Sequence, residues 1–279
     1  MRPVFTFLVL LVLLSAIPDA LLIATHGAVG LYVSFFMWTP GLASLVTCRI
    51  HRVNTRDPGW GWRTVRHKAY GYVLPLLYIT PVYVTTWLSV RGSFNLSSFA
   101  TRGAEVVGFA AWPRLATVGI YIPLLVTISI LSRFPNTVGE ELGWRGFLLP
   151  QIADRYGFTA GCLVTGIIWA VWHYPLLFAF GFFSRPNAAF HVACFSVMVI
   201  GLSFVIGWLR FTTDSIWPCV LLHASHNGFL QSIFDPLTAR VGIVPYLTTE
   251  FGAGLMLTVG IIAFFLAAPK VRAKGGVSQ

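Results

Sequence analysis

The chain of 279 residues is 56% hydrophobic and only 10% charged, with a formal net charge of +10. Its mean hydropathy of +0.76 excludes an ordinary soluble domain, in which about a quarter of the residues are charged. The positive charge does not indicate a nucleic-acid partner, because the basic residues are scattered over short loops, where they act as topology signals. The composition therefore predicts an integral membrane protein.

Eight apolar runs are each long enough, at about 20 residues, to cross a bilayer as a helix. They are 4–24, 28–48, 70–90, 116–133, 158–182, 189–209, 215–234 and 251–268. We interpret the first as a true helix rather than a signal peptide, because no clear small-residue cleavage site follows it and the second run begins almost at once. The expected fold is an all-α polytopic membrane bundle of about eight transmembrane helices.

Lys and Arg residues predict how this bundle is oriented. The segment 49–68 and the tail 269–279 are rich in them, so we expect both of these, and both termini, on the cytoplasmic side. Five of the 19 basic residues would then lie on the other side: Arg91, Arg102, Arg114, Arg185 and Arg240.

The stretch 134–156 is too polar to face lipid. It contains Glu140 and Glu141, two of only nine acidic residues, and Arg145 follows Glu141 by four positions, on the same face of a helix. Carboxylates in a membrane-embedded segment are costly and usually functional. We expect this segment to form a kinked or partly re-entrant helix that the bundle shields from lipid.

A purely structural explanation of the same residues is also open. Thr137 and Glu140 have the spacing of a helix capping box, in which Glu140 would reach back to the cap. A Glu141–Arg145 pair could simply stabilise the first turns of the helix.

Two further polar groups lie within apolar runs. Trp169 and His173 are four residues apart, as are His223 and Asn227, so each pair shares a helix face. His226 lies close to the face that His223 and Asn227 share. A lone intramembrane histidine is often only hydrogen-bonded to a neighbouring helix, but three polar partners in one short stretch favour a functional site.

Together these residues can perform acid–base chemistry. A carboxylate or an imidazole can take a proton from water, and imidazole or amide N–H groups can stabilise an oxyanion. The same Glu and His residues could instead hold a divalent metal such as zinc in an open site that polarises water. No nucleophilic serine or cysteine is indicated, since Ser225 lies on a different helix face from His223. The set predicts hydrolysis by activated water.

The three motifs resemble those of the CAAX-protease and bacteriocin-processing (CPBP) family of intramembrane proteases, related to CAAX prenyl protease type 2. The family pattern is Glu-Glu-x-x-x-Arg, then aromatic-x-x-x-His, then His-x-x-x-Asn. This chain has, in the same order, Glu140-Glu141-x-x-x-Arg145, Trp169-x-x-x-His173 and His223-x-x-x-Asn227. The second motif more often has Phe at the position of Trp169.

The resemblance implies a catalytic site of six residues: Glu140, Glu141, Arg145, His173, His223 and Asn227. Glu140 would activate the attacking water with help from His173. Glu141 and Arg145 would hold the Glu140 carboxylate in place, and His223 with Asn227 would stabilise the oxyanion. If a metal such as zinc takes part, Glu140, His173 and His223 are the expected ligands.

With this resemblance we divide the chain into three parts: N-terminal transmembrane helices without a family motif (1–115), a transmembrane protease-like core (116–268) and a basic cytoplasmic tail (269–279). The expected function is an intramembrane endopeptidase whose site opens toward the cytoplasmic leaflet. Its partners would be the lipid bilayer and a membrane-associated protein or peptide substrate, prenylated or hydrophobic, with no nucleic acid. The expected location is the plasma membrane of a prokaryote.

Two functions of other classes stay open. A non-catalytic membrane immunity or scaffold protein would keep the polar cluster only for helix packing. A proton-coupled transporter would use the intramembrane Glu and His residues as a proton relay. Against the transporter, the polar residues gather in one half of the chain and no inverted repeat is visible.

Overall fold

The computed structural model describes residues 1–27, 29–53, 59–62, 65–108 and 113–267, and in these ranges it contains helices and no β-strand. The helices are α1 (Arg2–Ala24), α2 (Gly30–His51), α3 (Val65–Ser89), α4 (Leu96–Val107), α5 (Arg114–Gly143), the π-helix η1 (Trp144–Leu148), α6 (Leu149–Tyr156), α7 (Phe158–Trp172), α8 (Tyr174–Ala179), the 3₁₀-helix η2 (Phe182–Ser184), α9 (Ala188–Thr213), α10 (Trp217–Phe229), the π-helix η3 (Leu230–Phe234), α11 (Val244–Leu247) and α12 (Ala253–Ala267). The expected all-α membrane bundle is confirmed. The predicted basic tail, 269–279, lies outside the described residues.

Six of the described helical segments are long and apolar enough to cross a membrane: Arg2–Ala24, Gly30–His51, Val65–Ser89, Leu115–Tyr156, Phe158–Ala179 and Ala188–Thr213. They correspond to the first six predicted runs. The last two predicted runs also form helices, α10 with η3 and then α12, but these are shorter or more polar. The total of eight spans and the cytoplasmic position of the termini stay predictions.

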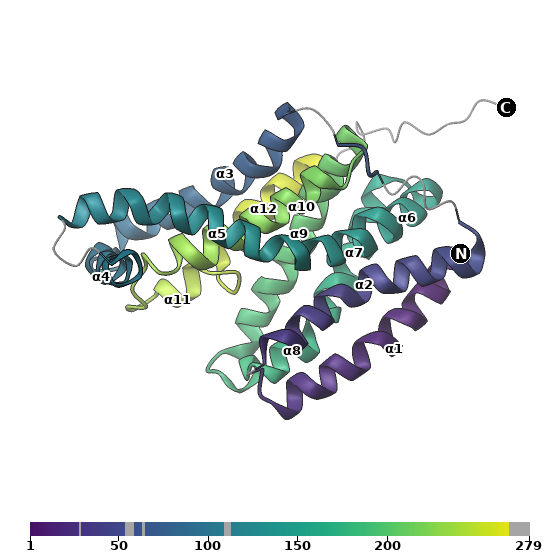
Figure 1. Cartoon of the computed structure of the whole chain (residues 1–279), viewed down its shortest axis with the longest axis horizontal. Coiled ribbons are helices and arrows are strands. Elements are labelled where there is room, and N and C mark those ends of the chain that lie inside the picture. Colours follow the sequence, from purple (N-terminus) through teal and green to yellow (C-terminus); the bar gives the residue numbers. More distant parts are fainter. Residues whose placement is uncertain (28, 54–58, 63–64, 109–112, 268–279) are drawn as a thin grey trace.

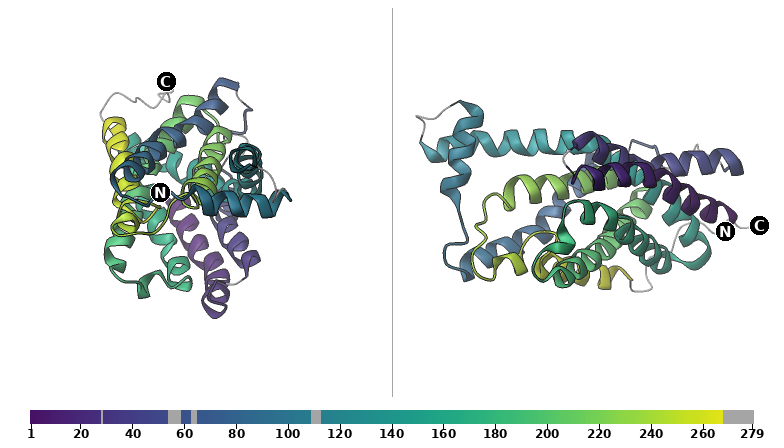
Figure 2. Two further views of the ribbon diagram at one scale, coloured as in Figure 1. Left: turned by 90° about the vertical axis from the view of Figure 1, so that its left-hand side faces the viewer. Right: turned by 90° about the horizontal axis from the view of Figure 1, so that it is seen from below.

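The bundle has two distinct ends. We call the end formed by α6, the start of α1 and the end of α2 the basic end, because it carries Arg49 and Arg52. The opposite end, here the distal end, is formed by α4, α11 and the α8–α9 connection. The basic end lies at the right of Figure 1 and the distal end at its left and bottom. The right-hand view of Figure 2 also shows the N-terminus at the end of the bundle opposite α4.

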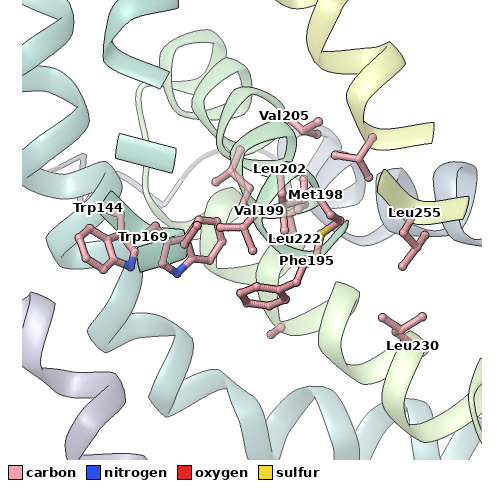
Figure 3. Packing of buried hydrophobic residues seen from close by; sticks show 14 of the residues in the cluster. Trp144, Trp169, Phe195, Met198, Val199, Leu202, Val205, Leu222, Leu230 and Leu255 are labelled. Carbon is pink, nitrogen blue, oxygen red and sulfur yellow. The ribbon is translucent and has the colours of Figure 1, made fainter. Parts of the chain in front are cut away.

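Helix α9 forms the centre of the core and packs against α7, α10 and α12. Its side chains Met198 and Leu202 are buried, and they meet Leu222 of α10 and Leu255 of α12 in one apolar cluster. Figure 3 shows this cluster with the indole rings of the motif-bearing segments at its edge. The core thus surrounds the elements that carry the polar motifs.

Helix α5 corrects one sequence-based expectation. We expected the span to end near residue 133 and residues 134–156 to form a kinked or partly re-entrant helix. In the structure, α5 continues through Pro135 to Gly143, and η1 and α6 extend it. A proline is tolerated there because neighbouring groups in a membrane bundle can satisfy the freed backbone carbonyl. The capping box is not formed either, since Thr137 lies inside the helix and its hydroxyl donates to the Phe134 carbonyl. The Glu-Glu pair therefore lies inside the bundle and directly before a π-helix, a feature frequent at functional sites.

Two glycines flanking the Glu-Glu pair allow α5 to approach α2 closely. A Cβ atom on Gly143 would lie 2.4 Å from Pro40, and one on Gly139 would lie 2.9 Å from the Cα of Trp38. On the α2 side, a Cβ on Gly41 would lie 2.7 Å from the Gly139 carbonyl oxygen. Such Gly-x-x-x-Gly contacts are a common way for membrane helices to pack. This crossing fixes the two glutamates relative to α2.

The N-terminal helices, which carry no family motif, pack directly on those that do. Phe36 of α2 stacks on Trp172 of α7 with ring centroids 4.0 Å apart. Trp172 also donates its Nε1–H to Ser15 of α1 over 3.0 Å. Phe7 of α1 contacts the π-helix η1 through an edge-to-face contact with Trp144. Helices α1 and α2 thus pack directly against α7 and η1, two of the segments near the motifs.

Candidate active site

Glu140 lies at the inner end of a cavity of about 460 Å³ within the bundle. Its carboxylate is almost fully buried, and its Oε2 accepts a hydrogen bond of 2.9 Å from the indole Nε1–H of Trp169. Because Trp169 comes from α7, this bond joins the first motif to the second. Trp169, for which the second motif requires only an aromatic side chain, therefore also orients the glutamate.

Four of the six predicted site residues line this cavity: Glu140, His173, His223 and Asn227. The other two, Glu141 and Arg145, lie behind it and are fully buried. The remaining wall is mainly apolar and includes Leu176, Leu177, Phe195, Met198, Val199 and Leu202. The structure thus brings residues from three separate motifs around one largely apolar space.

The predicted Glu141–Arg145 pair is present, with Arg145 Nη1 2.9 Å from Glu141 Oε1. The same oxygen lies 2.9 Å from Nδ1 of His223. Arg145 also lies over the ring of Trp169, with 4.4 Å between its Cζ and the ring centroid. The pair therefore contacts the two side chains that face Glu140, rather than Glu140 itself as the resemblance implied.

The hydrogen bond from His223 to Glu141 determines which ring nitrogen faces the cavity. An ionised carboxylate only accepts hydrogen bonds, so Nδ1 of His223 carries a proton. The other nitrogen, Nε2, lies 3.9 Å from Glu140 Oε1. Glu141 thus directs Nε2 of His223 toward the space beside the Glu140 carboxylate.

His173 is fixed in a similar way at the break between α7 and α8. Pro175 lies in the first turn of α8, and His173 is the junction residue between the two helices. Its Nδ1 lies 2.9 Å from the Trp169 carbonyl oxygen, which can only accept, so Nδ1 is the donor. In the neutral ring, Nε2 is then an acceptor that is available to a water molecule or a substrate.

The outer part of the cavity belongs to the distal end of the bundle. It is lined by Phe180, Phe182, Gln231 and Phe251, and α2 contributes the side chain of Val33 near its N-terminus. At the basic end, α6 and η1 pack on α7. The expected opening of the site toward the cytoplasmic leaflet stays a prediction.

If zinc takes part, the expected ligands are Glu140, His173 and His223. Among the described residues, no group of three His, Cys, Asp or Glu side chains is placed to hold a metal ion. Two of the expected ligand atoms, His223 Nε2 and Glu140 Oε1, lie 3.9 Å apart. Metal dependence stays a prediction.

Sequence reasoning missed a second polar group in the cavity, formed by Arg133, Gln231 and Glu250. Gln231 accepts from Arg133 Nη2 over 3.2 Å and donates to Glu250 Oε1 over 2.9 Å. His226 Nε2 lies 3.9 Å from the same Glu250 oxygen, and its Nδ1 is paired with the Tyr78 hydroxyl at 2.9 Å. One signal was visible in the sequence: Glu250 directly precedes the last apolar run.

Comparison with known proteins finds a similarity over the segment that carries this site. Residues 118–229 match the Rce1-like family, described as type II CAAX prenyl endopeptidase Rce1-like. A CAAX prenyl protease 2 from Methanococcus maripaludis is 28% identical over 101 residues. This segment of the chain is therefore similar to the type II CAAX prenyl endopeptidases, in agreement with the resemblance of the three motifs.

The family segment contains all six predicted site residues, from Glu140 to Asn227. The alignment with the M. maripaludis protein covers 36% of this chain and 33% of that protein, so it spans about one third of its relative. Arg133 lies inside the family segment, whereas Glu250 and Gln231 lie beyond its end. The second polar group is therefore built only partly from the family segment.

Proposed function

We propose that this protein is an intramembrane endopeptidase that hydrolyses a peptide bond of a membrane-associated protein or peptide. The observation that carries this proposal is the buried Glu140 carboxylate, with one oxygen held by Trp169 and the other facing the cavity beside His223. A fixed carboxylate with one free oxygen is suited to take a proton from water. The M. maripaludis relative, a CAAX prenyl protease 2, supports the same class of reaction.

The attacking water would lie between Glu140 and His173. Glu140 Oε1 takes a proton from it, while Nε2 of His173 accepts its second hydrogen bond and orients the oxygen. The water oxygen then adds to the carbonyl carbon of the substrate, and the proton stays on Glu140. Both side chains line the same cavity. Trp169 holds Oε2 of Glu140 and Nδ1 of His173, so the two atoms that would contact the water need little reorganisation.

The addition places negative charge on the former carbonyl oxygen. His223, when doubly protonated, and the Asn227 amide would donate hydrogen bonds to this oxyanion, because both side chains line the cavity. The proton on Glu140 then passes to the amide nitrogen as the C–N bond breaks. The products are a new carboxylate and a free amine, so atoms and protons balance.

The cavity favours a hydrophobic substrate segment. Its wall carries large apolar side chains of α8 and α9, and it lies within a membrane-spanning bundle. A prenylated or otherwise apolar peptide near a membrane surface fits this space. We place the reaction in the plasma membrane of a prokaryote.

Peptide hydrolysis by the purified protein in lipid nanodiscs tests the proposal. The substrates would be a panel of fluorogenic peptides with apolar C-terminal segments, with and without a farnesyl group. Wild-type protein should cleave at least one of them, and Glu140→Gln should reduce kcat by about 10²- to 10⁴-fold. Glu105→Gln is the matched control, since Glu105 is exposed on α4 and lies outside the cavity.

The same assay separates the alternatives. Activity that survives a strong zinc chelator supports water activation by Glu140 and His173, whereas activity lost on chelation and restored by zinc shows a metal enzyme. A biological function that persists in Glu140→Gln would instead favour the immunity or scaffold protein. Peptide-independent proton uptake by vesicles containing the protein would favour the transporter.

A further inference from the structure

The π-helix η1 deprives one backbone carbonyl of its usual hydrogen-bond donor. In an α-helix, the carbonyl of Arg145 would accept from the N–H of Leu149, four residues later. Here the Leu149 N–H donates to the carbonyl of Trp144 instead. The next residue, Pro150, has no N–H that could take over. The Arg145 carbonyl therefore needs a donor from outside its own helix.

Arg210 of α9 supplies this donor. Its Nε–H donates to the Arg145 carbonyl oxygen over 3.2 Å. Arg145 and Arg210 are both buried, so neither group can exchange this bond for one to bulk water without moving. The bond thus joins α9 to the π-turn that follows the Glu-Glu pair.

Neighbouring groups fix the guanidinium of Arg210. Its Nη1 donates to Asp214 Oδ1, one turn further along, over 3.0 Å. The backbone of Gly59 packs on the guanidinium so closely that a Cβ atom there would lie 3.0 Å from Arg210 Cζ. The Gly59 carbonyl in turn accepts from the N–H of Ile216 over 2.9 Å. The side chain is therefore held with its Nε–H directed at η1.

The π-turn affects where the Arg145 side chain points. Successive residues of an α-helix are about 100° apart around the axis, so a turn with one extra residue rotates the segments on its two sides relative to each other. From within this turn, Arg145 pairs with Glu141, which holds His223. Arg145 also lies over the ring of Trp169, which donates to Glu140. A change in the π-turn would thus reach the side chains on both sides of the proposed reaction.

From this geometry we propose that Arg210 is a positioning residue for peptide hydrolysis. Its Nε–H keeps η1 in the π-form and so keeps the Arg145 side chain directed at Glu141 and Trp169. This inference rests on the proposed endopeptidase function. Arg210 is not among the described residues that line the cavity, so its loss should lower kcat and leave KM nearly unchanged.

Two substitutions separate the hydrogen bond from the charge. The amide nitrogen of Gln is as many bonds from Cα as Nε of Arg, so Arg210→Gln can keep an N–H there without the charge. Arg210→Met keeps a stem of similar length but has a methyl group at this place. With Arg210→Met, kcat per folded protein should fall about 10- to 100-fold, with KM within about twofold. With Arg210→Gln, kcat should stay within about threefold of wild type.

The control is Asp214→Asn. It removes the ion pair of Arg210 but leaves the bond from Nε to η1, and Asn tolerates the φ of 50° at this position. The kcat of this variant should stay within about threefold of wild type. Wild-type kcat in Arg210→Met would overturn the proposal. So would an equal loss in Arg210→Gln and Arg210→Met, since the charge would then be what matters.

Hydrogen–deuterium exchange followed by mass spectrometry tests the contact without catalysis. Exchange of the segment 139–150 should be faster in Arg210→Met than in wild type and unchanged in Arg210→Gln. Exchange of α12 should be unchanged in both, which separates a local effect from general destabilisation. Unchanged exchange of 139–150 in Arg210→Met would overturn the proposal, even if the wild-type protein cleaves no peptide.

A failure of Arg210→Met to fold leaves the decision to Arg210→Gln. Wild-type exchange of 139–150 and nearly wild-type kcat in this variant would support the Nε–H as the positioning group. Faster exchange of this segment together with a lower kcat would overturn the proposal, because the N–H is retained. If wild-type protein cleaves no peptide of the panel, the endopeptidase function fails, and the exchange data still decide whether Arg210 holds η1.

Discussion

Trp169 of α7 donates its indole N–H to Glu140 of α5 over 2.9 Å, and the backbone carbonyl of the same Trp169 accepts from His173. One residue thus positions both side chains that would contact the attacking water. The orientation of Glu140 therefore depends on a hydrogen bond that a Phe at position 169 could not donate.

Trp169→Phe should reduce kcat/KM by about 10- to 100-fold, because a hydrogen bond to a buried carboxylate is removed while the backbone bond to His173 remains. Steady-state kinetics on the best peptide of the panel would measure this. The control is Trp172→Phe, since the Trp172 N–H donates to Ser15 and not to Glu140. A Trp169→Phe enzyme with wild-type kcat/KM would show that Glu140 needs no such donor.

Arg145→Ala should destabilise the protein by about 3–5 kcal/mol, because it leaves the buried Glu141 carboxylate without its cation. The activity of the variant should fall as well, because Glu141, which holds His223, would no longer be fixed by Arg145. Thermal unfolding in detergent and kinetics would report the two effects. Arg155→Ala is the control, because Arg155 is exposed at the end of α6. A stable and active Arg145→Ala protein would contradict the assigned support role.

Gly143→Ala should destabilise the α2–α5 crossing by about 1–3 kcal/mol, because the new methyl group would lie 2.4 Å from Pro40. Gly119 lies on the same helix, but a methyl group at this position would face open space, with no side chain or neighbouring helix within 4 Å. Gly119→Ala should therefore be neutral or slightly stabilising. Comparing the free energy of unfolding of the two variants isolates the contact from the effect of losing a glycine. Equal effects at both positions would rule out a close crossing.

Asp235 should make stability depend on pH. It follows η3, accepts from the Tyr83 hydroxyl and has Glu250 and Arg240 as charged neighbours. Burial raises its pKa from 3.8 to about 7 in the folded protein. Since the folded state then binds this proton more tightly than the unfolded state, the free energy of unfolding should fall as the pH rises from about 4 to about 7.

Asp235→Asn tests this dependence. The variant keeps an acceptor for Tyr83 but has no proton to lose, so its Tm relative to wild type should rise between about pH 5 and about pH 8. Thermal unfolding in detergent across this range measures the difference. Asp154→Asn, at an exposed position on α6, should show a constant difference. A constant difference for Asp235→Asn as well would mean that the folded protein does not hold this proton.

Much of the architecture follows from local features of the sequence. Each apolar run predicted a helix, and the four-residue spacing in the second and third motifs predicted that each pair shares a helix face. The structure shows that both faces line one cavity. The break predicted after residue 133 was wrong, because Pro135 and the polar residues after it look like an interruption when their surroundings are unknown. Inside the bundle, α2 and α7 cover this stretch, and the helix continues.

The rest depends on contacts between distant segments. Arg133 and Glu250 belong to one polar group in the cavity, but no periodicity links two residues so far apart in the chain. The role of Glu141 also needed the fold, since only the approach of α10 shows that it holds His223. The glycines beside the Glu-Glu pair have a clear function only once Pro40 is seen against them.

The helical repeat of α5 limits how this site can diverge. A helix presents a side chain to the same side only every three or four residues, a step of about 5 Å along its axis. Moving a guanidinium away from position 133 while keeping it in the cavity wall would thus change its distance from Glu140 by one whole turn. Relatives with a cation at another position of this wall are then expected to have it one whole turn nearer to the glutamate or farther from it. An intermediate distance would require a change in the helix itself, such as a π-turn like η1 inserted between the two positions.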